Sequence, residues 1–222
     1  MILKSWLFER QLPTREAKSL FIFCEGRKRE YQYFHYFKEI DSRINIEIYK
    51  LDSTENNSPN GLLEIAQKSI KSKDNKHPKY DFHEEIDEVW LVFDTDKDNF
   101  NSREKQISNI YSKCEKMKNW FAVQSNPCFE VWLYYHSKET IPKIHDIEKC
   151  SNWKELVDRI FSGGFDSRKH PILLNTAITN SKTNFKKNNH QLEIGTTEVF
   201  LLGESINNIV SDKIKKTFSQ NK

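Results

Sequence analysis

The chain has 222 residues and a formal net charge of +3, because 35 lysines and arginines nearly balance 32 aspartates and glutamates. This length is enough for one sizeable core and excludes several ordinary domains. The charge permits a nucleic-acid partner without demanding one, since basic clusters are most often solvated faces.

In chain order, the first 140 residues alternate between strand and helix patterns. Residues 1–18 carry mixed charge and few periodic apolar positions, which predicts an N-terminal arm. The elements predicted next are a strand over 19–24, a helix from Glu30 to about Ile40, a strand over 44–49, a helix over 61–71, a strand over 87–93, a helix from Ser102 as N-cap to about Lys116, and a strand over 120–124. This alternation favours a largely parallel sheet over residues 19–140.

The C-terminal third reads differently. Residues 128–136 are aromatic and amphipathic, which predicts a helix with Pro127 at its first turn and Asn126 as a candidate cap. Residues 141–222 read as short helices that pack on the core. We therefore expect a mixed α/β fold, a single domain with a helical C-terminal region.

Cysteine usage and hydropathy indicate where the protein works. The four cysteines are widely spaced and form no C-x-x-C pair, which favours free buried thiols over a zinc site or a disulfide framework. The N-terminus has no signal-peptide apolar region, and no apolar run approaches the ~18 residues of a spanning helix. We expect a soluble cytoplasmic protein with no membrane contact.

Acidic residues follow two of the apolar runs. Glu25 follows the strand predicted at 19–24, and Asp94, Asp96 and Asp98 follow the strand predicted at 87–93. The carboxyl ends of buried parallel strands converge on the crevice where ligands bind, so these carboxylates are expected to meet. Gathered carboxylates repel one another and are normally balanced by a hard cation. The pattern therefore predicts a Mg²⁺ or Mn²⁺ site and phosphoryl chemistry.

Other interpretations of the Asp94-x-Asp96 pattern fit less well. An EF-hand loop would need glycine where this chain has Asn99 and glutamate where it has Lys105. A haloacid-dehalogenase-type phosphatase would need threonine or valine in place of Asp98. A bare D-x-D most often ends a strand or caps a helix, so this pattern alone is weak evidence.

Three blocks together give the sequence a resemblance to the Toprim fold, and within it to the RloB-like family. Those blocks are Cys24-Glu25-Gly26 with Glu30, then Asp94 with Asp96, then the run Ser125-Asn126-Pro127-Cys128-Phe129-Glu130-Val131-Trp132-Leu133 followed by His136. Fainter similarity continues over 177–180 and 197–199. Members of that family often have an acid and a threonine where this chain has Arg27 and Arg29, and these two arginines could meet a phosphate or be solvated.

The resemblance implies a Toprim catalytic centre. In such a centre Glu25, Asp94 and Asp96 would hold one or two Mg²⁺ or Mn²⁺ ions at the scissile phosphate. Asp98 and Glu30 would be further metal ligands.

The third block would add a further catalytic residue. Glu130 would orient water or bind a second metal, or else anchor its helix. We expect His136 and the aromatic residues of the same segment to be packed.

The resemblance also implies a role. It would be a nuclease acting on RNA, tRNA included, or on DNA, and serving anti-phage defence under the control of an ABC-type or AAA-type ATPase. The sequence leaves open whether the protein forms a homodimer. The competing hypotheses are a non-catalytic Toprim-shaped subunit that binds or regulates such an ATPase, and a phosphatase or nucleotide hydrolase.

Overall fold

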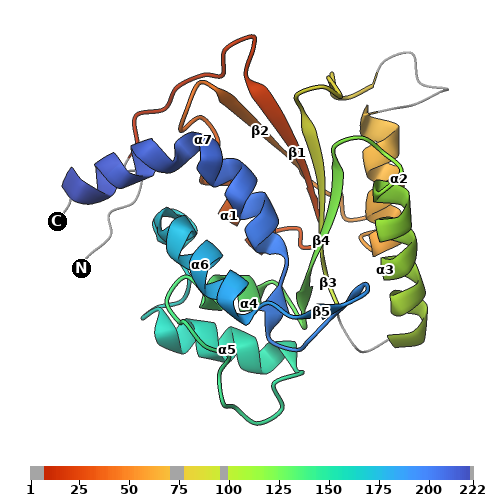
Figure 1. The fold of residues 1–222 in the computed structure, drawn as a ribbon, viewed down its shortest axis with the longest axis vertical. Coiled ribbons are helices and arrows are strands. Elements are labelled where there is room, and N and C mark those ends of the chain that lie inside the picture. The colour runs from red at the N-terminus through yellow and green to blue at the C-terminus, as the bar shows by residue number, and fades with distance from the viewer. Residues whose placement is uncertain (1–7, 71–77, 96–99, 221–222) are drawn as a thin grey trace.

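A central sheet organises the chain. The structure, a computed structural model, describes residues 8–70, 78–95 and 100–220 (Figure 1). Within these residues, five strands form one sheet in the order β2-β1-β3-β4-β7. They are β1 (Lys18–Cys24), β2 (Ile44–Tyr49), β3 (Glu88–Asp94), β4 (Trp120–Asn126) and β7 (Thr196–Thr197). The first four are mutually parallel and β7 is antiparallel to β4, which confirms the predicted mixed α/β fold with its mostly parallel sheet.

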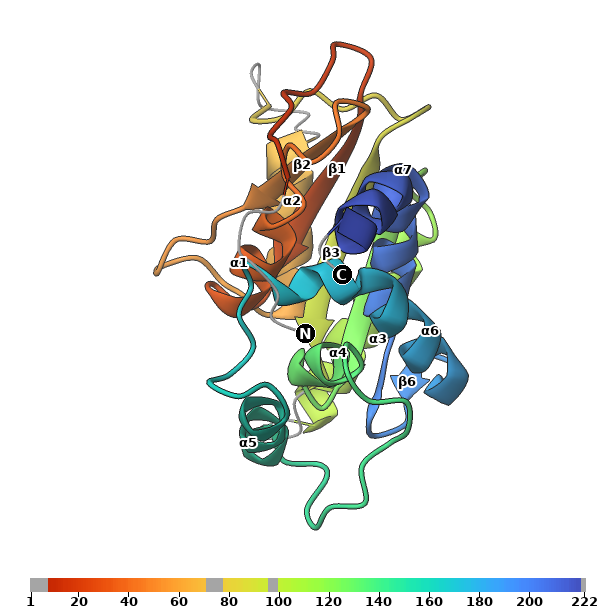
Figure 2. The same ribbon diagram turned by 90° about the vertical axis from the view of Figure 1, so that its left-hand side faces the viewer.

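Helices cover both faces of this sheet, as the two views in Figures 1 and 2 show. On one face lie α2 (Pro59–Ile70) and α3 (Phe100–Cys114). The other face carries α1 (Arg29–His35), α4 (Glu130–Tyr134), α6 (Leu174–Asn184) and α7 (Val199–Gln220). A 3₁₀ turn, η2 (His170–Leu173), precedes α6, and α5 (Cys150–Ile160) lies near the end of the molecule where β3 and β4 finish.

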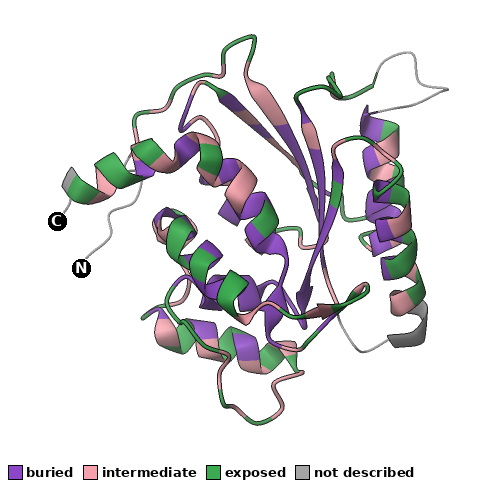
Figure 3. Ribbon diagram, viewed as in Figure 1, coloured by how far each residue is buried: buried purple, intermediate pink, exposed green. Residues whose placement is uncertain are grey.

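The strands β1, β3 and β4 are largely buried on both faces because each helical layer packs its own apolar core on them. In β3, Val89 and Leu91 face the α2–α3 layer, while Trp90 and Val92 face the other layer. The core on that second side also includes Trp132 of α4, so the C-terminal helices and the N-terminal strands share one core. Figure 3 shows the consequence: the strands are largely buried, and exposed residues gather on the outer faces of the helices.

Several predicted boundaries were wrong. The helix α3 begins at Phe100, so Ser102 is its third residue rather than its N-cap. The segment after β4 forms only the five residues of α4, and Pro127 lies before that helix rather than in its first turn. No described side chain caps α4, and the side-chain amide of Asn126 instead donates to the Leu192 carbonyl at 2.7 Å.

The C-terminal region also departs from the prediction of short helices alone, because α7 runs for 22 residues. The helix continues through Gly203. That glycine faces Trp132 and Ile178, where an added Cβ would lie 3.2 Å from either side chain. The hairpin of β5 (Lys187–Asn188) and β6 (Gln191–Leu192) was not predicted either. Among the described helices, none combines the length and apolar character needed to cross a membrane.

Of the predicted N-terminal arm, residues 1–7 lie outside the described residues, and residues 8–17 run along the surface. The Gln11 amide donates to the Glu39 carbonyl and the Thr14 amide to the Ser42 carbonyl, each at 2.8 Å. Lys18, placed in the arm by sequence reasoning, is the first residue of β1.

Candidate active site at the carboxyl edge of the sheet

Two of the predicted acidic residues meet at the centre of the sheet. The chain leaves β1 toward β2 on one side and returns as β3 on the other, so the crevice between β1 and β3 is a topological switch point, where α/β sheets bind ligands. Glu25 follows β1 and Asp94 ends β3. The Asp94 amide donates to the Glu25 carboxylate at 3.0 Å, so residues 69 positions apart in the chain lie side by side.

Arg103 of α3 holds this pair, and sequence reasoning missed it. Its guanidinium forms an ion pair with the Glu25 carboxylate, and its Nε donates to the Asp94 carbonyl at 3.2 Å. Both side chains of the ion pair are mostly buried, at 14% and 17% exposure. The sequence signal was slight, a single arginine nine positions after Asp94, and its role depends on how α3 packs.

Glu30 joins the cluster from the first turn of α1. It is 7% exposed and lies against the backbone of Gly26, where an added Cβ would come 1.8 Å from the Glu30 carboxylate. The glycine is therefore needed for space beside Glu30. The pKa of Glu30 is raised to about 7, first by desolvation and then by the charges of Glu130 and Glu25.

Glu130 completes the group from α4. It is 4% exposed, and Arg29 of α1 forms an ion pair with it at 3.0 Å. Arg29 thus stabilises a buried carboxylate rather than being only solvated. Arg27 instead donates to the Ser53 carbonyl at 3.0 Å, which ties the turn after β1 to a neighbouring loop.

A cavity of about 910 Å³ opens beside these carboxylates. Its lining includes the carboxylates Glu30, Asp94 and Glu130, the thiols Cys128 and Cys150, and the cations Lys28, Arg29, Lys149 and Lys154. The pKa of Asp94 is raised well above its usual range, by desolvation first and then by Glu30 and Glu25. Sequence reasoning did not foresee the contribution of α5, whose Cys150 and Lys154 come from a region expected only to pack on the core.

Carboxylate oxygens suit a hard divalent cation in kind, and the pKa values of Glu30 and Asp94 are raised by burial and by the neighbouring carboxylates. The described carboxylates do not form a complete set of metal ligands. Among the described residues, no three carboxylate, thiol or imidazole side chains lie close enough together to ligate one ion. The remaining predicted ligands, Asp96 and Asp98, lie outside the described residues.

His136 and the aromatic residues of the third block are packed, as expected. His136 is 2% exposed; it lies 3.0 Å from the Tyr33 hydroxyl and 3.0 Å from the Trp132 carbonyl. The aromatic side chains around it are buried; they are Phe129, Trp132, Tyr134 and Tyr135. All four cysteines, which lie within the described residues, are free thiols, with Cys150 the least buried.

Strand order, two helical layers and a carboxylate cluster at the switch point define a doubly wound α/β protein with an acidic site at the carboxyl edge of its sheet. The family model for RloB-like protein matches residues 20–206, so the chain belongs to the RloB-like family. Searches of curated proteins and of solved structures found no match.

Proposed function

We propose that this RloB-like protein is a metal-dependent nuclease of the Toprim type, which hydrolyses phosphodiester bonds in RNA or DNA. One observation carries the proposal: Glu25, Glu30, Asp94 and Glu130 converge from four elements on the switch point of the sheet. Such a concentration of carboxylates beside a large polar cavity suits a site for Mg²⁺ or Mn²⁺ and a phosphate.

The residues of the site would have different roles in the reaction. Glu25 and Asp94, with Asp96 beyond the described residues, would hold the metal, and Arg103 fixes the position of Glu25. A bound Mg²⁺ or Mn²⁺ would stabilise the charge on the attacking and leaving oxygens of the phosphodiester.

Glu30 would take part in proton transfer, and Glu130 would position water. With a pKa of about 7, Glu30 can hold or release a proton near neutral pH. Glu130, oriented by Arg29, would position the attacking water.

The cations around the cavity support a polyanionic substrate. Lys28 and Arg29 line it from the α1 side, and Lys149 and Lys154 line it from the start of α5. Cations on two sides of an acidic centre could contact the phosphates on either side of the cleaved bond. As a member of the RloB-like family, the protein would act in anti-phage defence as an effector that an ABC-type or AAA-type ATPase licenses.

A second candidate function has its own observation. Two of the four carboxylates already form ion pairs with arginines: Glu25 pairs with Arg103, and Glu130 pairs with Arg29. A site neutralised from within needs less from a metal, which would suit a non-catalytic subunit that binds or regulates the ATPase.

Cleavage of a mixed panel separates the two functions. Wild type, Asp94→Asn and the control Asp81→Asn, whose carboxylate is 93% exposed, are incubated with plasmid DNA, single-stranded DNA and total tRNA in Mg²⁺ or Mn²⁺. We expect wild type and Asp81→Asn to cut one class of polymer and Asp94→Asn to lose at least about a hundredfold in rate. The nuclease proposal fails if no protein cuts, even with the expected ABC-type or AAA-type ATPase partner added, or if Asp94→Asn cuts as fast as wild type.

A further inference from the structure

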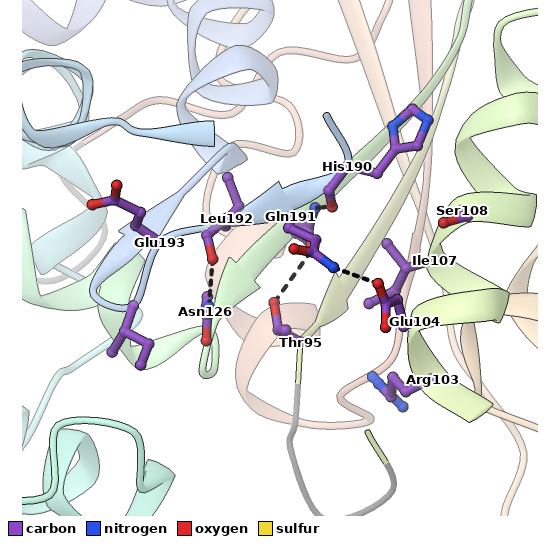
Figure 4. A pocket seen from close by; sticks show the side chains of 12 residues that line it. Thr95, Arg103, Glu104, Ile107, Ser108, Asn126, His190, Gln191, Leu192 and Glu193 are labelled. Atoms are coloured by element: carbon purple, nitrogen blue, oxygen red, sulfur yellow. Dashed lines mark hydrogen bonds between the residues drawn. The ribbon is translucent and has the colours of Figure 1, made fainter. Parts of the chain in front are cut away.

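The acidic site borders two cavities, which differ in their thiols. The smaller cavity, of about 350 Å³, lies between α3 and the β5–β6 hairpin, and Arg103 is part of its wall (Figure 4). No cysteine is among its described lining residues. The larger cavity, of about 910 Å³, is lined by Cys128 and Cys150 together with Asp94 and Glu130. Two thiols therefore lie beside the carboxylates that we expect to act on the substrate.

These two thiols are in contact with each other. The Cys128 thiol is hydrogen-bonded to the Cys150 thiol, and this bond, together with burial, raises the pKa of Cys128. Cys128 comes shortly after the end of β4, whereas Cys150 is the first residue of α5. The contact therefore joins the carboxyl edge of the sheet to the start of α5.

The two thiols differ in their access to solvent. Cys128 is 2% exposed, whereas Cys150 is partly exposed where it lines the cavity. A dissolved oxidant would therefore reach Cys150 first and leave Cys128 beside it as the resolving thiol. A structural metal fits this pair less well. Among the described residues, no third carboxylate, thiol or imidazole lies close enough to complete a metal site.

We propose that Cys128 and Cys150 form an oxidation site, at which a peroxide converts the two thiols into a disulfide. The peroxide first oxidises the Cys150 thiol to a sulfenic acid and is itself reduced, with release of one water. The Cys128 sulfur then attacks the Cys150 sulfur, so that an S–S bond forms, the S–O bond breaks and a second water leaves. Overall the two thiols give up two electrons and two protons, and a dithiol reductant reverses the change.

The disulfide would also regulate the acidic site. It brings the two sulfurs from hydrogen-bond contact to a separation of about 2 Å, which draws the start of α5 toward Cys128. Lys149 and Lys154 line the cavity from that end of α5, and Glu130 lines the same cavity. We expect the oxidised form to hold these groups together and to obstruct the substrate. This consequence rests on the proposed function, whereas the disulfide itself does not.

Peptide mapping tests the oxidation site. Reduced wild type is treated with hydrogen peroxide, and its remaining thiols are alkylated in denaturant. Trypsin then separates Cys128, on residues 119–138, from Cys150, on residues 150–154. We expect these two peptides to be cross-linked and dithiothreitol to release them, while two of the four thiols stay free. Cys150→Ser should keep all of its thiols. The control Cys114→Ala, altered in the core on the α2–α3 side, should form the same cross-link as wild type.

The proposal fails if peroxide takes Cys150 of wild type to the sulfinic acid without any cross-linked peptide. It also fails if all four thiols survive the treatment, or if the cross-link joins two molecules rather than one, as a non-reducing gel would show. None of these results depends on cleavage of a nucleic acid.

Cleavage before and after oxidation tests the regulation. We expect oxidised wild type to cut its polymer at least about tenfold more slowly than the reduced protein, because small displacements around a reacting group are costly in rate. Dithiothreitol should restore the rate, and peroxide should leave the rate of Cys150→Ser unchanged. Equal rates for reduced and cross-linked wild type would overturn the regulation. A cross-link in a protein that never cuts, even when reduced, would support the oxidation site and count against the nuclease.

Discussion

The position of the Glu30 carboxylate depends on residue 26 being glycine. Because a Cβ on residue 26 would lie 1.8 Å from the Glu30 carboxylate, Gly26→Ala must displace that carboxylate from its buried position. We expect a loss of about 1–2 kcal/mol in the free energy of unfolding, as for other overpacked sites. In a Glu30→Ala background the same substitution should be neutral or slightly stabilising. Urea unfolding of the four proteins measures this, and an equal loss in both backgrounds would contradict it.

His136 makes stability depend on pH. Burial lowers its pKa from 6.5 to about 3, and the neutral ring can accept from the Tyr33 hydroxyl at Nε2 while it donates from Nδ1 to the Trp132 carbonyl. The unfolded state therefore binds more protons between these two pKa values, so stability is lost as pH falls below 6.5. The loss should reach a few kcal/mol, at about 1.4 kcal/mol per pKa unit.

Denaturant unfolding between pH 7.5 and pH 5 tests this in wild type, His136→Gln and the control His83→Gln, whose ring is 67% exposed. Glutamine stays neutral over this range, so His136→Gln should show a clearly shallower fall in stability than the other two proteins. The interpretation is wrong if all three proteins lose stability in parallel.

At the scale of elements, one buried ion pair joins the hairpin to the start of α7. Lys187 lies 2.6 Å from the Glu198 carboxylate, which is 4% exposed, and its ammonium lies 4.1 Å from the centroid of the Tyr111 ring. Lys187→Met should cost about 3 kcal/mol, because it leaves a buried carboxylate without its cation. The neighbouring pair of Lys186 and Glu193 is exposed on both sides, so Lys186→Met should cost less than about 1 kcal/mol.

Thermal unfolding compares the two lysine variants directly. Equal melting temperatures for the two variants would show that the buried pair does not stabilise the protein more than the exposed pair does.

Elements with long apolar runs were predictable, and short ones were not. The first four strands came within two residues of their observed ends because β1, β3 and β4 are largely apolar and buried, and β2 alternates apolar with polar residues. The strand β7 and the hairpin have two residues per strand, too few for any periodicity to register. Their positions depend on side chains such as Gln124, whose partners are distant in the sequence.

The same contrast holds for the site. Glu25 and Asp94 could be placed together from sequence because each ends a buried strand, and the sheet determines where strands end. Arg103, Arg29 and the lysines of α5 act through contacts between elements, which no local pattern encodes. The sequence therefore indicated that Glu25 and Asp94 lie together, but it did not indicate the cations that surround them.

At the scale of the whole molecule, folding brings negative charges together at one edge of the sheet. The raised pKa values of Glu30 and Asp94 express that cost, which the paired arginines offset only in part. A divalent cation bound at this edge should therefore stabilise the folded protein. The gain would be about 2.7 kcal/mol at a concentration one hundred times the dissociation constant.

The change in melting temperature with added Mg²⁺ or Mn²⁺ measures this stabilisation, with NaCl at equal ionic strength as the reference. Asp94→Asn removes one of the repelling carboxylates, so in EDTA it should be as stable as wild type or more stable. In the presence of the metal it should gain much less than wild type, because it lacks a ligand. Asp81→Asn, altered at an exposed carboxylate, should behave as wild type. An equal metal-induced shift in wild type and Asp94→Asn would mean that the cation binds elsewhere, and the carboxylates at the switch point would then need another explanation.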